Sequence, residues 1–247
     1  MPVVLITGSG RGIGAAAALL AAQRGWDVCI NYMGRADRAE AVVKEIRSLG
    51  RKAVAVQGDV ANEADVKRIF DTCDRELGTL TALVNNAGIV GKAGKLMDYD
   101  AAIVRRVLDV NVTGSFLCAQ QAAQRMSTKR GGKGGVIVNV SSLAGVNGGG
   151  NQWIPYAAAK GAVNTMTLGL SRELAPEGIR VNAILPGLID TEIHAEAGVA
   201  DRLTKVLPQV PMGRIGTPQE CAEAILWLMS GEAAYMVGAI IPLSGGR

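Results

Sequence analysis

Val-Val-Leu-Ile-Thr-Gly-Ser-Gly-Arg-Gly-Ile-Gly, residues 3–14, joins a short apolar run to a glycine-rich loop. Residues 3–6 are continuously apolar, which favours a buried strand, and the alanine- and leucine-rich residues 13–24 favour a helix. Gly8, Gly12 and Gly14 between them are spaced GxxxGxG, a looser variant of GxGxxG. In a strand–loop–helix unit such glycines let the backbone approach a pyrophosphate, and the helix N-terminus supplies amide donors. The stretch therefore predicts an α/β fold that begins with a phosphate-binding loop.

Strand and helix patterns alternate along the rest of the chain. Further strands are expected at residues 26–31, 52–57, 81–84, 135–141, 178–185 and 238–242. Helices are expected at residues 35–49, 62–76, 100–126, 156–174 and 217–229, and residues 188–211 are expected to form one or two short helices of a movable lid. No repeat, low-complexity tract or linker interrupts this order, so residues 1–247 are expected to form a single domain.

The residues at the end of the second expected strand indicate whether a bound dinucleotide would be NAD(H) or NADP(H). In dinucleotide folds, a carboxylate about twenty residues after the glycines binds the ribose 2′-hydroxyl of NAD. This chain has Asn31-Tyr32 there, followed by Arg35, while Arg11 lies in the glycine loop and Asp27 is at the wrong end of the strand. Two arginines could pair with a 2′-phosphate, which predicts NADP(H) as cofactor. The alternative is that both arginines only face solvent.

A tyrosine–lysine pair marks the expected chemistry. Tyr156 and Lys160 are four residues apart, which places both side chains on one face of a helix. A nearby ammonium would lower the pKa of the phenol toward the working range of a proton shuttle. Ser141 and Ser142 both stand at the end of the preceding strand, and we take Ser142 as the residue that would hold a substrate oxygen beside Tyr156. Tyr and Lys at this spacing could also be an ordinary pair on a helix surface.

Asn111 stands near the middle of the long helix expected at residues 100–126. Asparagine is disfavoured inside helices. It is therefore either a surface residue or part of a local distortion where it binds water.

Composition excludes several classes of function. Charged residues make up 19% and the net charge is +4, too small and scattered for nucleic-acid binding. The four cysteines are widely separated and there is one histidine, His194, so no metal site and no disulfide framework is expected. No leader-like N-terminus and no apolar run of membrane-spanning length is present, so a cytoplasmic protein without a membrane partner is expected.

Five motifs in register resemble those of the short-chain dehydrogenase/reductases. They are Thr7-Gly8-x-x-x-Gly12-x-Gly14, Asn85-Asn86-Ala87-Gly88, Ser142, Tyr156-x-x-x-Lys160 and Pro186-Gly187. Among subgroups the chain looks most like the bacterial 3-oxoacyl-carrier-protein reductase and glucose dehydrogenase types. The resemblance implies a Rossmann-type, doubly wound, seven-stranded parallel sheet in the order 3-2-1-4-5-6-7 with helices on both faces. It also implies a homotetramer built through the two long helices and the C-terminal strand.

The resemblance also implies a role for each matching residue. Tyr156 would be the acid/base, Lys160 would bind the nicotinamide ribose, Ser142 would hold the substrate oxygen, and Asn111 would position a water in the proton relay. Asp59 would contact adenine, and Ile189 and Thr191 the carboxamide of nicotinamide. The whole implied set that binds NADP(H) is Gly8, Ser9, Arg11, Gly12, Ile13, Gly14, Asn31, Tyr32, Arg35, Asp59, Val60, Asn86, Ala87, Gly88, Tyr156, Lys160, Pro186, Gly187, Ile189 and Thr191.

The expected activity is hydride transfer between nicotinamide and a small-molecule carbonyl or secondary alcohol. Candidate walls of the substrate pocket are Leu143, Asn151, Trp153, Ile154, Leu188 and His194, although each could equally serve loop packing or a subunit contact. Alternatives are a 3-oxoacyl thioester reductase and a glucose 1-dehydrogenase. The turn at residues 175–178 has no basic residue for an acidic carrier protein, and glucose would want a more polar pocket. A nucleotide sensor without catalysis is the alternative from another class.

Overall fold

In the computed structural model, residues 1–193, 197–199 and 201–247 are described. The strands are β1 (Val3–Ile6), β2 (Asp27–Tyr32), β3 (Ala53–Gln57), β4 (Ala82–Asn85), β5 (Gly135–Val140), β6 (Ile179–Pro186) and β7 (Ile240–Leu243). The helices are α1 (Gly12–Gln23), α2 (Ala36–Ser48), α3 (Glu63–Leu77), α4 (Ala101–Leu108), α5 (Gly114–Met126), α6 (Ala144–Asn147), α7 (Ile154–Leu174), α9 (Arg202–Val206) and α10 (Pro218–Met229). All seven strands expected from the sequence are present, with ends that differ by one or two residues.

The seven strands form one parallel sheet in the order β3-β2-β1-β4-β5-β6-β7. This confirms the order expected from the sequence resemblance. The chain first winds outward from β1 to β3 and then crosses to β4 on the other side of β1, so the direction of winding reverses between β1 and β4. In an open α/β sheet, this reversal leaves a crevice at the carboxyl ends of the two strands, where ligands bind.

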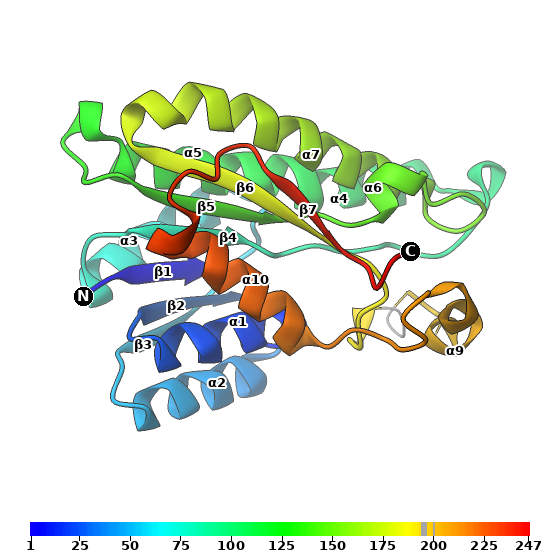
Figure 1. Cartoon of the computed structure of the whole chain (residues 1–247), viewed down its shortest axis with the longest axis horizontal. Coiled ribbons are helices and arrows are strands. Elements are labelled where there is room, and N and C mark those ends of the chain that lie inside the picture. The colour runs from blue at the N-terminus through cyan, green and yellow to red at the C-terminus, as the bar shows by residue number, and fades with distance from the viewer. Residues whose placement is uncertain (194–196, 200) are drawn as a thin grey trace.

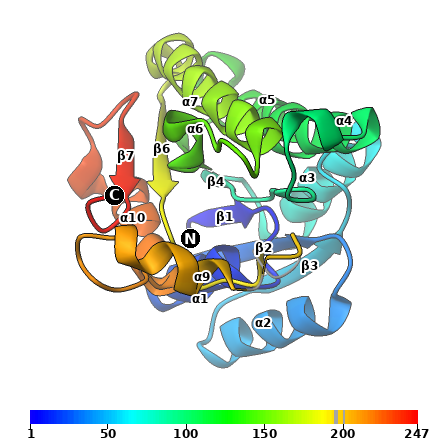
Figure 2. The same cartoon turned by 90° about the vertical axis from the view of Figure 1, so that its right-hand side faces the viewer.

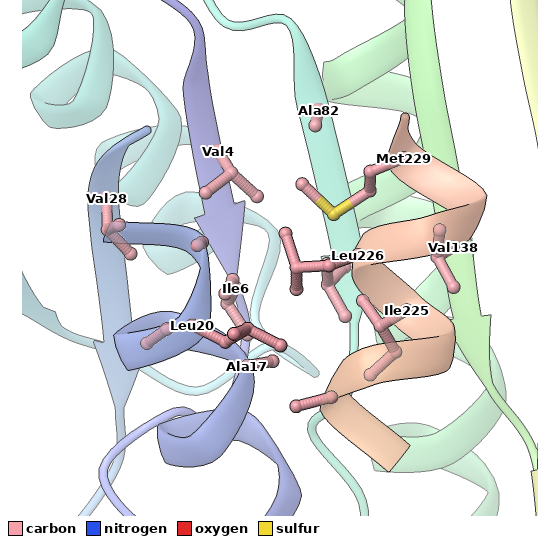
Figure 3. Packing of buried hydrophobic residues seen from close by; sticks show 14 of the residues in the cluster. Val4, Ile6, Ala17, Leu20, Val28, Ala82, Val138, Ile225, Leu226 and Met229 are labelled. Carbon is pink, nitrogen blue, oxygen red and sulfur yellow. The ribbon is translucent and has the colours of Figure 1, made fainter. Parts of the chain in front are cut away.

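Helices cover both faces of the sheet (Figures 1 and 2). One apolar cluster joins the sheet to α1, α2 and α10, and a second joins it to α3, α5 and the end of α7. Figure 3 shows Leu226 and Met229 of α10 packed between β1, β4 and β5. In α3 the residues that face the sheet recur with helical spacing: Val66, Ile69, Phe70 and Cys73. Burial of these faces positions the helices on the sheet.

The prediction of a single helix at residues 100–126 is wrong. Helix α4 ends at Leu108, residues Asp109–Thr113 form a π-helical turn, and α5 begins at Gly114. Asn111 lies in this turn and is fully buried, so it is part of a local distortion and not a surface residue. Its amide nitrogen donates to the carbonyl of Val107 four residues earlier and to that of Ile89, each at 2.8 Å. A side chain that bonds the backbone inside a helix favours such a distortion.

The segment after β6, residues 188–211, holds α9 and a 3-10 turn at Leu207–Gln209. A bridge between Ile189 and Gly216 ties its start to the chain just before α10. Figure 1 places α9 on the right, beyond the carboxyl ends of the strands and on the same side as the C-terminus. Its movement as a lid stays a prediction. Across the described residues, no helix has the length and hydropathy that a bilayer span requires.

Candidate active site

A cavity of about 920 Å³ opens at the carboxyl ends of the strands. Its walls come from the glycine loop after β1, the loops after β2 and β4, the end of β5, the start of α7, and residues within 186–193 and 202–209. It therefore lies at the reversal between β1 and β4, the expected place for a ligand in this architecture.

The glycine loop leaves room that side chains would fill. Gly8 and Gly12 have φ values of +62° and +54°, which favour glycine, and a Cβ on Gly8 would lie 2.9 Å from the Cα of Ala87. Thr7 fastens this loop to the next one, since its hydroxyl accepts from the backbone amides of Asn86 and Ala87 at 3.0 and 2.9 Å. The bare loop backbone and the N-terminus of α1 form a cradle that fits the pyrophosphate of a dinucleotide.

Several residues expected to touch the cofactor also fix the loop by hydrogen bonds or close packing, and two of them, Ser9 and Gly14, do not line the cavity. The side-chain nitrogen of Asn86, Nδ2, donates to the carbonyls of Thr7 and Gly8. A Cβ on Gly14 would lie 2.5 Å from that nitrogen. Ser9 is fully buried and donates to the carbonyl of Ile6. Asn31 accepts from the amide of Gly8 and donates to two carbonyls at the end of β3. These contacts fix the shape of the loop.

Ser142, Tyr156 and Lys160 meet beside the loop. The Ser142 side chain lies close enough to Tyr156 to act on the pKa of the tyrosine hydroxyl. The Lys160 ammonium lies 5.7 Å from the centre of the Tyr156 ring and donates to the carbonyl of Val140, at the end of β5, at 2.8 Å. Ser141 faces away from this group, because its hydroxyl donates to the carbonyl of Lys160. The geometry therefore favours Ser142 over Ser141 as the partner of Tyr156.

Burial has the largest effect on the pKa of both titratable groups. It raises the pKa of the Tyr156 hydroxyl, while the nearby Ser142 side chain lowers it by a smaller amount. It lowers the pKa of Lys160 to about 8. The expected lowering of the Tyr156 pKa is not found in this structure, because the cost of burying a phenolate prevails. Tyr156 is therefore held protonated at neutral pH, whereas the pKa of Lys160, about 8, lies close to neutral pH.

The side chains of Asn111 and Lys160 both lie next to Gly88. The side-chain oxygen of Asn111 is buried and has no hydrogen-bond partner among the residues that the structure describes. A Cβ on Gly88 would lie 2.6 Å from that oxygen and 3.4 Å from the Lys160 nitrogen. An unpaired buried acceptor next to an ammonium favours a bound water, which would satisfy both groups.

The arginines near the end of β2 already have acidic partners. Arg35 pairs with Asp37 at 2.7 Å, and Glu192 of the segment after β6 pairs with Arg38 at 2.6 Å and with Arg11 at 3.2 Å. These pairs are solvent-exposed, so each holds its partners weakly. A phosphate group on the ribose could replace the carboxylates.

Most residues implied by the resemblance line the cavity. Those that do not are Ser9, Gly14 and Asn111, which support it from behind. Of the expected substrate walls, Leu143, Trp153 and Leu188 line it, whereas Asn151 and Ile154 do not. Asn151 is exposed and takes a left-handed turn with φ of 64°, and Ile154 begins α7. His194 lies outside the described residues.

Other lining residues escaped the sequence analysis. Arg38 lies in the first turn of α2, three residues after Arg35 at the N-cap, and this spacing is a signal that could have found it. Arg106 pairs with Asp59, the residue expected at adenine, at 2.8 Å. Gln152 and Arg202 enter the cavity from segments fifty residues apart, and no local pattern predicts their meeting.

Comparison with known proteins agrees with this architecture. A family profile described as "Enoyl-(Acyl carrier protein) reductase" matches residues 8–247. A crystal structure of a short-chain type dehydrogenase/reductase from Mycobacterium marinum matches with a TM-score of 0.93 and 36% identity, over 99% of this chain and 94% of that chain. This chain belongs to the short-chain dehydrogenase/reductase family.

Two further members of the family are similar over nearly the whole chain. The "Uncharacterized oxidoreductase YgfF" of Escherichia coli is 45% identical over 100% of both chains. A short-chain dehydrogenase from Burkholderia cenocepacia, solved in complex with NADP, matches with a TM-score of 0.91 and 35% identity, over 99% of this chain and 97% of that chain. The protein is thus an oxidoreductase of this family that acts on alcohol or carbonyl groups.

Proposed function

We propose that this protein is an NADP(H)-dependent oxidoreductase that reduces a carbonyl group, or oxidises the matching secondary alcohol, with Tyr156 as acid/base. The observation that carries the proposal is the meeting of Ser142, Tyr156 and Lys160 in the cavity that also contains the glycine loop. A protein that only sensed a nucleotide would have no chemical need for this group of residues.

The roles of the residues follow from where they lie. Bound NADPH would supply the hydride that adds to the carbonyl carbon. Ser142 and Tyr156 would donate hydrogen bonds to the carbonyl oxygen, and Tyr156 would pass its proton to that oxygen as the alcohol forms. Lys160 and a water held by Asn111 would return a proton to the tyrosine. The raised pKa of Tyr156 suits this direction, because the proton to be donated stays in place at neutral pH.

The residues that would hold the cofactor fit a dinucleotide. The loop with Gly8 and Gly12 would hold the pyrophosphate, and Lys160 the nicotinamide ribose. Arg11, Arg35 and Arg38 surround the end of the cavity beside β2. The carboxylates near them, Asp37 and Glu192, are paired with these arginines, which reduces their repulsion of a 2′-phosphate. This arrangement supports NADP(H) over NAD(H). A clearly higher kcat/KM with NAD(H) would defeat that part of the proposal.

Replacement of the tyrosine tests the central role. The Tyr156→Phe variant should lose turnover and keep NADPH binding, measured by the quenching of protein fluorescence. Tyr235→Phe is the matched control, because Tyr235 is fully exposed and lies outside the cavity. A Tyr156→Phe enzyme with near-normal kcat would refute the assignment.

The substrate needs a direct screen. Curated relatives that are 37% identical include a 3-oxoacyl-[acyl-carrier-protein] reductase of Staphylococcus aureus and Glucose 1-dehydrogenase 2 of Bacillus subtilis. We expect NADPH oxidation with ketones or aldehydes, in a screen that also includes quinones, to exceed that with 3-oxoacyl thioesters on a carrier protein, and to exceed glucose oxidation in the reverse direction. The turn at residues 175–178 offers no basic residue to an acidic carrier protein. The pocket wall includes the apolar side chains of Leu143, Trp153 and Leu188, which disfavour glucose.

We also infer a homotetramer. Large apolar side chains are exposed on the outer surfaces of the helices and near the C-terminal strand, among them Phe116 of α5, Leu168 of α7 and Tyr235 before β7. Exposed apolar surface on long helices favours contact with another subunit.

A further inference from the structure

Arg202 is held at the wall of the cavity next to Tyr156. Its guanidinium carbon lies 4.0 Å from the centre of the Trp153 ring, and one terminal nitrogen, Nη1, donates to the side-chain oxygen of Gln152. Trp153 packs in one apolar cluster with Tyr156 and Val90. Trp153 thus contacts both Arg202 and Tyr156, the proposed acid/base, and these two residues line the same cavity.

The stacking and the Gln152 contact leave one edge of the guanidinium unused. Among the described residues, the buried Nε has no hydrogen-bond partner and no hydrogen bond involves Nη2. Nε and Nη2 form the planar fork that binds both oxygens of a carboxylate. A buried donor without a partner is unfavourable, because it has lost its hydrogen bonds to water. A ligand oxygen at this edge would remove that cost.

The charges around Arg202 also favour an anion. Burial has the largest effect in lowering the pKa of Arg202, and the nearby charge of Arg247 lowers it further. Lys205, on the same part of the wall, is exposed and paired with Asp201, so its charge contributes little to an anion site. Among the described residues that line the cavity, the acidic ones are Asp59 and Glu192, and both are already paired with other arginines. In the described part of the chain, no carboxylate forms an ion pair with Arg202.

We propose that Arg202 recognises a carboxylate on the substrate, so that the protein acts on oxo acids and the matching hydroxy acids. The inference rests on the proposed function, because it concerns the substrate of the same site. Arg202 would bind the carboxylate through Nε and Nη2 while Trp153 and Gln152 hold the guanidinium in place. The same fork can also pair with a phosphonate, so the test includes a phosphonate substrate. Arg202 is then a specificity-determining residue that does not take part in the proton transfer.

Matched pairs of substrates test the proposal. Reduction by NADPH would be measured for 3-oxobutanoate, 4-oxopentanoate and 4-oxocyclohexanecarboxylate, each against its methyl ester, and for 2-oxopropylphosphonate. The wild-type enzyme should prefer at least one acid over its ester. In Arg202→Met, kcat/KM for that acid should fall roughly 10- to 100-fold, mostly through KM, while the value for the ester stays within about twofold. Methionine keeps an apolar contact with the Trp153 ring, so the wall should stay packed.

Two further variants separate charge from position. Lys205→Met is the matched control, because Lys205 lines the same cavity but is exposed and paired with Asp201, and it should leave the preference unchanged. Arg202→Lys keeps the charge and loses the fork, so it should recover only part of the preference. NADPH binding to every variant, measured by fluorescence, should match the wild type and would show that the fold is intact.

The outcomes distinguish this inference from the proposed function. Equal rates for acids and esters, a preference for the phosphonate, or an equal loss for both substrates in Arg202→Met would overturn the role of Arg202. The proposed function would stand in each of these cases. If the wild type reduced no carbonyl compound of the wider screen with either cofactor, the proposed function itself would be wrong.

Discussion

Burial governs the acid–base behaviour of single residues in this site. The Lys160 side chain reaches a buried position where the carbonyl of Val140 accepts from its nitrogen. One hydrogen bond to a neutral carbonyl does not replace the lost hydration of an ammonium, and the pKa of Lys160 falls to about 8. Its charge therefore becomes sensitive to pH in a range where enzymes are readily assayed.

The reduction rate should depend on that charge. Tyr156 stays protonated through neutral pH because its pKa is raised, whereas Lys160 is charged below about pH 8 and neutral above it. We expect kcat/KM for reduction to be level below pH 8 and to fall as the pH rises through it. Profiles of wild type and Lys160→Arg would be compared. The arginine stays charged, so its residual activity should lack this fall. A fall at the same pH in both enzymes would contradict the assignment to Lys160.

Gly88 is the second residue whose replacement is informative. Its missing side chain leaves the space between the Asn111 oxygen and the Lys160 nitrogen, and an added Cβ would lie only 2.6 Å from that oxygen. Gly88→Ala should lower kcat by about 100-fold, because the proposed proton relay would be displaced. Gly94→Ala in the same loop is the control, since its Cβ would meet nothing closer than 3.9 Å. Unchanged kcat in Gly88→Ala would argue against the relay.

At the scale of elements, the helix interruption between α4 and α5 places Asn111. An unbroken helix would have kept the hydrogen-bonding pattern regular and left no reason for this side chain to bond two carbonyls. The sequence showed only that asparagine is out of place there and left two alternatives. The π-helical turn depends on the carbonyl of Ile89, which comes from a segment 22 residues away. A local pattern could not have included it.

The segment after β6 contributes a carboxylate to the proposed cofactor site. Glu192 competes with a 2′-phosphate for Arg11 and Arg38. The Glu192→Gln variant should therefore bind NADPH roughly 2- to 5-fold more tightly, with little change for NADH. Binding would be measured by fluorescence titration at low salt, with Glu223→Gln as control, because Glu223 forms its exposed pair with Arg24 instead. An equal change for both cofactors would show that the carboxylate acts in another way.

At the scale of the whole molecule, sheet order brings the site together. Elements that are distant in the sequence meet because β4 lies beside β1, so the loops after these strands share Thr7 as a hydrogen-bonding centre. The outer helix surfaces remain partly apolar, and we infer that they are covered by other subunits.

Assembly offers a test at this scale. We expect the wild type to have a mass of four chains in light scattering after gel filtration. Phe116→Glu should reduce it to a dimer or monomer, because Phe116 is 48% exposed on α5 and a charge cannot be buried there without a partner. Leu49→Glu is the control, with Leu49 43% exposed at the end of α2 near the edge of the sheet. A monomeric wild-type protein would refute the tetramer.

The amino-acid sequence by itself determined the parts of the protein that depend on short spacings. The glycine loop, the alternation of strands and helices, and the Tyr156–Lys160 pair could be predicted because their physical causes act within a few residues. Only the tertiary structure decided the rest: that Asn31 supports the loop, that burial and not Lys160 controls the pKa of Tyr156, and that Arg202 stacks on Trp153. Desolvation and side-chain contacts across the fold depend on which distant segments pack together, and no local pattern contains that information.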